Sequence, residues 1–465
     1  MSISQLDRPV AAPSRAPLPG APPAGGVPAG WSPRSVLAGI SAGGLLALLL
    51  WLSGGAGLTG SAAAFVTALG RLAGLAGGYA VVVLLLLMGR VPALEHGVGA
   101  DKLARWHARG GRFTVCVLAA HAVLIIWGYA LAAHASPVGE TATLLRSYPD
   151  VAMATVALGL LVGVGVLSAR AARARMRYET WYHLHLYTYL AVALGFSHQF
   201  ANGTDFVANP AARACWAALY AGVAATLAWH RVVVPVRQAF RHRMRVVEVR
   251  PEAPGVVSVL VAGESLGELA AQPGQFFRWR FLTRDGWWQS HPFSLSAPPH
   301  ARMLRITVKT LGDYSSWLQN VRPGTRVMTE GPYGALTAAR RRQPRVLLLA
   351  GGIGVTPLRT LFETLPGEPG EITLLYRARS AEDLVFRDEL TAIATARGAR
   401  LSFLLGPSGG PRDPLTGAHL AGLVPGLREH DVFVCGPAGM AVAARAALRA
   451  AGVPAKSIHT EHFAF

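Results

Sequence analysis

Two apolar stretches with histidines near both ends decide the architecture of the first half of the chain. The first is RWHARGGRFTVCVLAAHAVLII, residues 105–126, and the second is HLHLYTYLAVALGFSH, residues 183–198. His107 and His121 are 14 positions apart, and His185 and His198 are 13 positions apart. On an α-helix such a spacing covers about 20 Å, so each helix would hold one imidazole near each face of a bilayer.

These histidines are candidate metal ligands. Ionisable side chains at membrane depth are costly and by default suggest function, and imidazole is a usual axial ligand of haem iron. We therefore expect two haems clamped between two helices, with four ligands: His107, His121, His185 and His198. Ideal helical phase aligns His183 better than His185 with His198. His185 would need a distorted turn near Gly195, so the residues alone leave that choice open.

The composition is that of a multidomain membrane protein. The chain has 465 residues, 52% of them hydrophobic and only 15% charged. It is too long for one domain and too apolar for a wholly soluble protein. Six segments are long and apolar enough to cross the hydrocarbon core, which predicts a six-helix, all-α transmembrane bundle. They lie near residues 35–53, 62–89, 110–133, 150–168, 183–201 and 211–234.

Basic residues set the expected orientation. They gather in the loops before the third and fifth spans and after the sixth, whereas the opposite loops offer little beyond Arg146 and Arg213. By the positive-inside rule, we expect a multi-pass protein of the plasma membrane with both termini cytoplasmic. The first histidine of each helix pair then lies near the cytoplasmic face and the second near the outer face. The net charge of +19 is explained by anionic lipid, so the expected partner is the bilayer and not nucleic acid.

The cysteines and the N-terminal segment narrow the chemistry further. Cys116, Cys215 and Cys435 are isolated, without CxxC or CxxCH, which argues against iron–sulfur clusters, structural zinc and covalently attached haem. Any haem would then be b-type, held by the histidines. Residues 1–33 are rich in Pro, Ala and Gly and are expected to form a disordered cytoplasmic tail. The sequence does not indicate the oligomeric state.

The sequence pattern changes at about residue 244, where the long apolar segments end. Six short β-branched and aromatic runs separated by turn residues predict an antiparallel six-stranded β-barrel. They are Met244–Val249, Val256–Val261, Gln275–Phe281, Trp287–Leu295, Leu304–Thr310 and Arg326–Thr329. From residue 345, strands near 346–350, 372–376, 401–405 and 431–434 alternate with helical segments. That alternation predicts an α/β domain with a doubly wound parallel sheet.

Two glycine-containing turns follow strands of this sheet. Gly351-Gly352-Ile353-Gly354-Val355-Thr356-Pro357 connects a strand to a helix with proline in its first turn. Glycines let backbone amides approach a phosphate, and a helix N-terminus adds partial positive charge. A second open turn, Cys435-Gly436-Pro437, ends a later strand. Ligands of open α/β sheets bind at this carboxyl edge, so the two turns predict a nucleotide site.

Several of these motifs, in order, resemble the ferredoxin–NADP reductase module. They are His291-Pro292-Phe293-Ser294, Lys309 to Ser316, Gly331-Pro332-Tyr333-Gly334, Gly351 to Pro357, and Cys435-Gly436-Pro437. With the histidines ahead of them, the chain from about residue 34 onward is similar to the ferric reductase and NADPH oxidase superfamily, in a compact bacterial form. The resemblance implies a haem domain at 34–235, an FAD-binding barrel at 236–340 and an NAD(P)-binding domain at 341–465.

The resemblance also implies roles for single residues. It favours His185 over His183 as a haem ligand, pairing His107 with His185 and His121 with His198. Residues that would bind FAD are His291, Pro292, Phe293, Ser294, Lys309, Gly312, Ser315 and Ser316. Residues that would bind the nicotinamide nucleotide are Gly351, Gly352, Gly354, Thr356, Pro357, Gly436 and Pro437, with Arg377 and Arg379 favouring the 2′-phosphate of NADPH over NADH. Cys435 would sit beside the nicotinamide, and Phe465 would stack on the flavin.

These expectations combine into a transmembrane oxidoreductase. Electrons from cytoplasmic NADPH or NADH would pass through FAD, which converts hydride into single electrons, to two b-type haems. The expected acceptor at the outer face is ferric iron. The alternative is dioxygen, with Arg146 and His134 as cationic groups that could stabilise superoxide. A rival of another class is a haem-free membrane scaffold or sensor that carries a flavoprotein domain.

Overall fold

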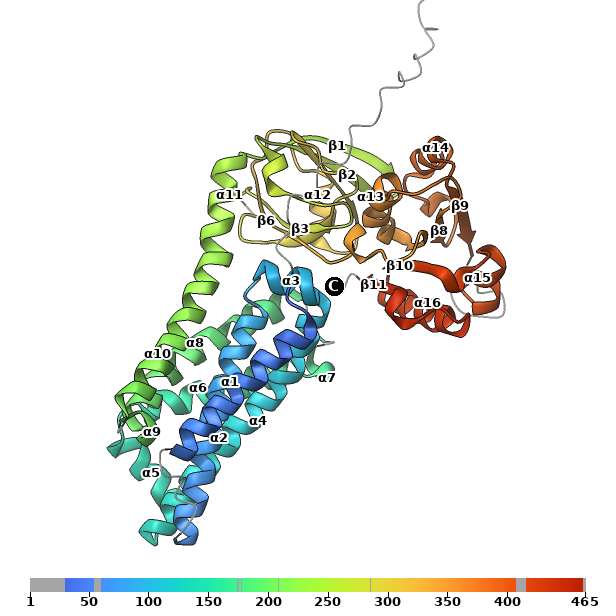
Figure 1. The fold of residues 1–465 in the computed structure, drawn as a ribbon. Helices are drawn as coiled ribbons and strands as arrows, with labels where there is room; N and C mark the ends of the chain where they lie inside the picture. The colour runs from blue at the N-terminus through green and yellow to red at the C-terminus, as the bar shows by residue number, and fades with distance from the viewer. Residues whose placement is uncertain are drawn as a thin grey trace, which may run out of the picture.

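The computed structural model shows a helical domain, a β-rich domain and a C-terminal α/β domain (Figure 1). It describes residues 30–53, 60–173, 175–176, 178–207, 209–284, 286–406 and 415–462. Phe465 and almost all of the predicted N-terminal tail lie outside the described residues.

Long helices form the first domain. Their bounds are α1 Pro33–Ser53, α2 Ala62–Leu87, α4 Ala100–Ala133, α6 Val151–Leu167, α8 Tyr178–Asn202 and α10 Pro210–Ala228. Shorter helices join them: α3 Pro92–Val98, α5 Pro137–Ser147, α7 Arg170–Arg173 and α9 Thr204–Val207. A helix therefore occupies each of the six segments predicted from the sequence.

Only part of this set meets the requirements for a membrane span by length and composition. Four described helices do so: Pro33–Leu52, Ala62–Leu87, Lys102–Ala133 and Pro210–His242. The pair α5 and α6, bent by 116°, would make a fifth if it forms one span. The remaining long helix, α8, carries histidines, tyrosines and Gln199, which make it more polar than a lipid-exposed span.

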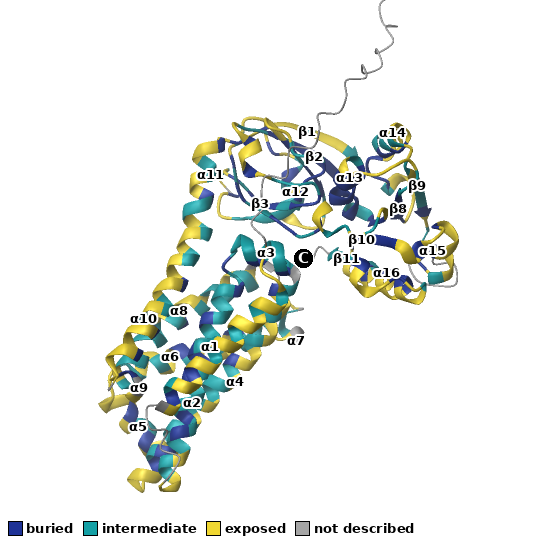
Figure 2. Cartoon of the chain, in the orientation of Figure 1, coloured by how far each residue is buried: buried dark blue, intermediate teal, exposed yellow. Residues whose placement is uncertain are grey.

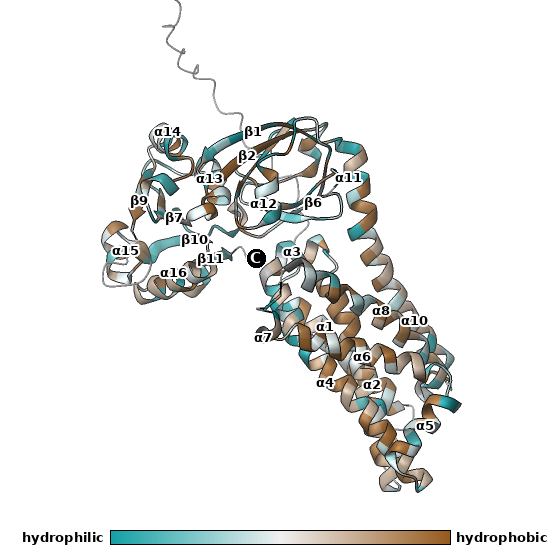
Figure 3. Cartoon of the chain, turned by 180° about the vertical axis from the view of Figure 1, so that it is seen from behind, coloured by the Kyte–Doolittle hydropathy of each residue, from teal (hydrophilic) through white to brown (hydrophobic). Residues whose placement is uncertain are grey.

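The surface of the long helices agrees with a membrane location. Many of their large apolar side chains are exposed, for example Phe113, Val123 and Trp127 on α4 at 60%, 61% and 51%. Much of the surface of the long helices is exposed in Figure 2, and the same helices are coloured largely as hydrophobic in Figure 3, whereas the parallel strands β7, β8 and β10 are almost entirely buried. Contiguous exposed apolar surface of this extent is typical of contact with lipid. The chain thus contains a multi-pass transmembrane domain.

A continuous helical rod connects this domain to the β-rich domain (Figure 1). Helix α10 runs into a π-helical turn, η1 Trp229–Val233, and then into α11 Val234–His242. Proline lacks an N–H group and clashes with the preceding turn, so Pro235 gives a physical reason for the widened turn. Arg231 in this turn donates two hydrogen bonds to the Met88 carbonyl at 2.7 and 3.2 Å, which fastens the rod to the end of α2.

The β-rich domain has the six predicted strands in two three-stranded antiparallel sheets. The strands are β1 Arg245–Ala253, β2 Val256–Ala262, β3 Phe276–Phe281, β4 His291–Ser294, β5 Met303–Lys309 and β6 Val327–Tyr333. The sheet orders are β1-β2-β5 and β4-β3-β6. Isolated bridges, Arg245 to Arg326 and Leu295 to Ile306, link the two sheets. Alternate residues of β3, Phe277, Trp279 and Phe281, are fully buried in the shared core.

The C-terminal domain is a doubly wound parallel sheet. Its strand order is β11-β10-β7-β8-β9. The strands are β7 Arg345–Gly351, β8 Ile372–Ala378, β9 Arg400–Leu405, β10 His430–Gly436 and β11 Ile458–His462. The helices are α13 Val355–Thr364, α14 Arg387–Arg397, α15 Gly417–Leu423 and α16 Ala438–Ala450, and α12 Asp313–Leu318 belongs to the β-rich domain. Two core clusters cover opposite faces of the sheet, one with α13 and α14 and one with α15 and α16.

Candidate functional site

The predicted histidines meet in two pairs between α4 and α8. The ring centroids of His107 and His185 are 5.9 Å apart, and those of His121 and His198 are 6.4 Å apart. The first pair lies at the end of α2 that faces the β-rich domain, because His107 Nδ1 is 3.1 Å from the Leu84 carbonyl. We call it the proximal pair, and His121 with His198 the distal pair. His183 belongs to neither pair.

Helix α8 holds both of its paired histidines without interruption. It is α-helical from Tyr178 to Asn202, across Gly195. The distorted turn expected near Gly195 is therefore wrong. Because α8 is a regular helix, the orientation of the side chains, and not a distortion of the backbone, brings His185 and His198 to their partners on α4.

The distal pair is held by polar contacts beside an open space. His121 Nδ1 lies 2.7 Å from the Gly70 carbonyl, and His198 Nδ1 lies 3.1 Å from Nδ2 of Asn202. A cavity of 280 Å³ borders both histidines and is also lined by Arg71. Arg71 was not predicted from the sequence, because a single arginine in an apolar helix gives no sign of the direction in which it points.

An aromatic ring covers one member of the proximal pair. The indole of Trp181 stacks on His185 with ring centroids 5.1 Å apart and planes 27° apart. Nδ1 of His185 is buried, with no hydrogen-bond partner among the described residues. The proximal pair is thus packed against an aromatic ring, whereas the distal pair borders a cavity.

Both pairs fit the axial ligands of a haem. Metal–imidazole bonds of about 2 Å place the centroids of two opposed imidazoles roughly 6 Å apart, close to both observed separations. Bonds from Nδ1 of His107 and His121 to backbone carbonyls leave Nε2 of each ring for iron, which is the usual arrangement of ligating histidines. A Cβ at Gly74 would lie 2.6 Å from His121 Nδ1, so this glycine makes room for the ring. Among the described residues, no cluster of three or more His, Cys, Asp or Glu side chains is placed to hold a metal ion.

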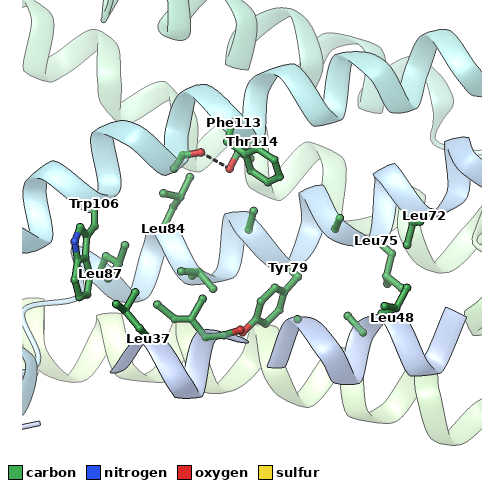
Figure 4. A pocket seen from close by; sticks show the side chains of 17 residues that line it. Leu37, Leu48, Leu72, Leu75, Tyr79, Leu84, Leu87, Trp106, Phe113 and Thr114 are labelled. Atoms are coloured by element: carbon green, nitrogen blue, oxygen red, sulfur yellow. Dashed lines mark hydrogen bonds between the residues drawn. The ribbon is translucent and has the colours of Figure 1, made fainter. Parts of the chain in front are cut away.

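A larger cavity of 410 Å³ lies away from the histidines, between α1, α2 and α4. Its labelled lining is almost entirely apolar (Figure 4). The two hydroxyls in it already donate to carbonyls, Tyr79 to Ile40 at 2.8 Å and Thr114 to Gly110 at 2.8 Å. Both hydroxyls are therefore already satisfied, and the other polar side-chain group in the lining is the indole N–H of Trp106.

Ion pairs fasten the β-rich domain to the helical domain beside the proximal pair. Glu330 on β6 is 5% exposed and pairs with Arg90, which follows α2, and with Arg280 on β3 at 3.7 Å. Burial, with Arg278 nearby, lowers the pKa of Arg90 to about 9, so Arg90 stays cationic at neutral pH. Nε2 of Gln238 donates to the Gly331 carbonyl at 2.9 Å. The Gly331–Gly334 motif thus lies at the junction with the membrane domain.

The predicted FAD residues gather on β4, β5 and α12. His291 stacks on Tyr314 with ring centroids 3.8 Å apart, and burial raises the pKa of the Tyr314 phenol. The hydroxyl of Ser294 is buried, with no hydrogen-bond partner among the described residues, as expected for a group that awaits a ligand. Lys309 lies 3.7 Å from Asp383 of the α/β domain.

The turn before α12 is open to solvent. The Ser315 hydroxyl accepts from the amides of Leu311 and Gly312 at 2.8 and 3.0 Å, and the Ser316 hydroxyl donates to the Gly312 carbonyl. An added Cβ at Gly312 would meet nothing within 4 Å. The predicted pyrophosphate site therefore has free space above the turn.

The two glycine turns of the α/β domain interlock. Strands β7 and β10 are neighbours, with Ala350 opposite Cys435. A Cβ at Gly354 would lie 2.3 Å from the Cys435 carbonyl oxygen, and one at Gly351 would lie 2.0 Å from Met440 Sδ. Gly352 has φ +51° with open space around it. The sheet thus brings the predicted nucleotide residues to one edge, and only glycine fits where the turns touch.

Other predicted nucleotide residues lie at this edge in different settings. Thr356 and Pro357 are buried at the start of α13, with the Thr356 hydroxyl donating to Ile353 at 3.0 Å. Arg377 lies inside β8, opposite Gly351, and is 5% exposed, whereas Arg379 is exposed in the loop that follows. Strand β8 therefore extends two residues beyond Tyr376, where the sequence pattern ended it. Gly436 ends β10, and Pro437 precedes α16.

Cys435 is fully buried in the core between the sheet and α13. It is the next-to-last residue of β10, immediately before Gly436, so its predicted place beside a nicotinamide stays a prediction. Strand β11, which the sequence pattern did not predict, runs beside Cys435 and Gly436. A Cβ at Gly334 would lie 3.3 Å from Glu461 Oε1. The last described residues thus approach the β-rich domain, and the predicted contact of Phe465 lies beyond them.

Comparisons with known proteins agree with this arrangement. Residues 73–196 match the family model of the ferric reductase like transmembrane component, residues 243–337 that of an FAD-binding domain, and residues 348–446 that of an oxidoreductase NAD-binding domain. FAD- and NAD-binding domains are therefore present beside the transmembrane domain.

Individual relatives match about half of the chain. An NADPH oxidoreductase of Mycobacterium tuberculosis is 31% identical over 240 residues, which are 50% of this chain and 62% of that protein. Ferredoxin–NADP reductase B of Sorangium cellulosum is 30% identical over 245 residues, which are 49% of this chain and 99% of that protein. The FAD/NAD-binding domain of a nitric oxide dioxygenase from Vibrio cholerae is 26% identical, with a TM-score of 0.41, and the match covers 48% of this chain and 98% of that one.

The chain spans less than two thirds of the length of the Mycobacterium relative but nearly the whole Sorangium reductase. The membrane-domain match lies ahead of the two nucleotide-binding matches in one continuous sequence. The chain therefore belongs to the ferric reductase and NADPH oxidase superfamily, in which a ferric reductase-like transmembrane component is fused to an FAD- and NAD-binding module of the ferredoxin–NADP reductase type.

Proposed function

We propose that the protein passes electrons from cytoplasmic NADPH or NADH, through FAD and two b-type haems, to ferric iron on the outer side of the plasma membrane. The observation that carries this proposal is the meeting of four histidines in two pairs, 5.9 and 6.4 Å between ring centroids. His107 and His121 are 14 positions apart on α4, about 20 Å at the rise of a helix. Two haem sites spaced this way suit electron passage across a bilayer.

The proposal includes α6 and α8 in a six-helix bundle with both chain ends cytoplasmic. Helix α8 is too polar to face lipid on all sides, but its paired histidines His185 and His198 face partners on α4, and some of its other polar groups are engaged inside the domain. Gln199, for example, accepts from Trp216 Nε1 at 2.8 Å. Polar side chains in membrane helices usually face the bundle interior.

The residues of the chain would hold each cofactor in place. When bound, a flavin converts a two-electron hydride transfer into single-electron steps that haem iron can take. His291 to Ser294 would line the flavin, and the turns at Gly351 to Pro357 and at Gly436 would admit the nucleotide pyrophosphate. His107 with His185, and His121 with His198, would supply the axial nitrogens.

Dioxygen is the second candidate acceptor, and one feature favours it. Arg71 lines the cavity beside the distal pair, and a cation in a low-dielectric cavity would stabilise developing superoxide. Arg146 and His134, the cations expected from the sequence, are exposed at the protein surface instead. Oxygen consumption together with dye reduction that superoxide dismutase abolishes would replace ferric iron by dioxygen.

The visible spectrum of detergent-purified protein tests the proposal. We expect two haems per FAD, and anaerobic NADPH should reduce both haems. A flavin signal without haem would contradict the proposal and leave the haem-free membrane flavoprotein as the better description. Ferric chelate added outside sealed proteoliposomes, with NADPH inside, then tests the acceptor and the direction together.

A further inference from the structure

His183, the histidine that the two pairs leave out, contacts the β-rich domain. Its ring centroid lies 5.4 Å from that of Trp288, with the planes tilted by 54°. His183 is on α8, and Trp288 lies between β3 and β4. The contact therefore joins the transmembrane domain to the FAD-binding domain. Trp288 remains 44% exposed, so the contact lies at the rim of their interface.

Both partners are close in sequence to a candidate redox site. His183 comes two positions before His185, whose ring faces His107 at 5.9 Å. Trp288 comes three positions before His291, the first residue of β4. The contact thus connects a short stretch of α8 beside the proximal pair with the strand predicted to line the flavin.

Hydrogen bonds from β3 hold the segment that carries Trp288. Arg278 Nη2 donates to the Ser290 carbonyl at 2.7 Å, and Arg280 Nη1 donates to the Trp287 carbonyl at 3.2 Å. Strand β3 pairs with β6, where Glu330 forms its ion pair with Arg90 of the membrane domain. A sheet fastened at a second point holds the indole against α8, so the contact does not depend on a free loop.

We propose that the His183–Trp288 contact is a positioning contact, which sets the separation between the flavin site and the proximal histidine pair. Neither residue is a ligand in this role. Electron transfer between two centres slows steeply as they move apart, so a shift of the FAD domain over the end of α8 would slow the step between domains and leave hydride transfer unchanged. The inference rests on the proposed function.

Anaerobic stopped-flow mixing with NADPH separates the two steps, because flavin bleaching and haem reduction are read at different wavelengths. In H183A and W288A we expect flavin bleaching at the wild-type rate and haem reduction slowed about tenfold or more, as for other losses of positioning. The conservative variants H183F and W288F keep an aromatic contact and should retain most of the rate. W287A, which removes the neighbouring exposed indole, is the matched control and should behave as wild type.

Other outcomes would overturn the inference. Unchanged haem reduction in both alanine variants would exclude a positioning role, and loss of one haem in H183A would make His183 a ligand. The contact itself can be tested without haem, by joining the cysteines of H183C/W288C with a short bismaleimide and identifying the linked peptides by mass spectrometry. Failure to link them would also contradict the inference. A wild-type protein without haem would overturn the proposed function, even where the link forms.

Discussion

The two histidine pairs have the same ring geometry but different surroundings. The distal pair borders a 280 Å³ cavity with Arg71 in its wall, and hydrogen bonds hold both of its histidines. The proximal pair is stacked against Trp181 and lies beside the ion-paired junction with the FAD-binding domain. The difference teaches that one helix pair can hold two similar histidine pairs in unlike settings; under the proposed function, the proximal pair would receive electrons and the distal pair would deliver them beside the cavity. The supporting residues, and not the ligands, differ between the two.

The largest effects are expected from replacing one candidate ligand of each pair, because the two replacements should block electron flow at different steps. In H198A we expect loss of the distal haem, with the remaining haem still reduced by NADPH and acceptor reduction at background. In H185A the remaining haem should respond to dithionite but not to NADPH, because its electron donor is gone. Haem quantification and anaerobic spectra measure both. H134A, at an exposed histidine near the distal end, is the control, and equal effects of H198A and H185A on NADPH-driven reduction would contradict the order.

Filling the space beside His121 should weaken haem binding at the distal pair only. In G74A the new Cβ would meet His121 Nδ1, 2.6 Å away, so the ring must turn and lose its bond to Gly70. Overpacking of this kind costs about 1–3 kcal/mol, and we expect partial loss of the distal haem with the proximal haem intact. The haem content and the thermal unfolding midpoint report this effect.

The matched control for this change is G111A, also in a long helix of the bundle, where an added Cβ meets nothing within 4 Å. It should bind both haems. Full distal haem content in G74A would show that the ring tolerates the methyl group.

Arg71, in the wall of the distal cavity, should distinguish dioxygen from ferric iron as the electron acceptor. In R71Q we expect superoxide production to fall about tenfold, because the charge that stabilises the anion is removed, while ferric chelate reduction changes little. Parallel assays with oxygen and with a ferric chelate make this comparison. R146Q, at an exposed arginine of the same end, should alter neither rate, and an equal fall of both in R71Q would point to a structural role.

The smallest effect is expected from replacing Trp181, the aromatic ring that stacks on the proximal pair. W181L removes the ring stacked on His185 but keeps an apolar side chain. We expect both haems to bind and a modest shift in the midpoint potential of the proximal haem alone, because the polarity around a haem tunes its potential. Redox titration followed by absorbance measures the shift. A shift of the distal haem instead would contradict the assignment of the two haem sites.

Much of the site was predicted from local pattern. Apolar length placed six helices, turn residues separated six short strands, and the glycine turns after β7 and β10 were recognised before the sheet was known. Strand β11 was missed, because five residues that end in Glu461 and His462 have no alternating pattern of their own. The sequence indicated the candidate ligands but not the residues around them: Arg71, Glu330 and Trp288 carry no motif, and only packing gives them partners.

The sequence by itself determined most of the segments that are helices or strands, which residues are candidates for binding a metal or a phosphate, and where glycine was needed. These features depend on residues within one or two turns of each other. The tertiary structure alone decided that His183 meets Trp288 and that Glu330 ties a strand to Arg90; it also places His185, which the family resemblance favoured, opposite His107. Such contacts join elements far apart in the chain, and they follow from the angle and register of packing, which local periodicity does not specify.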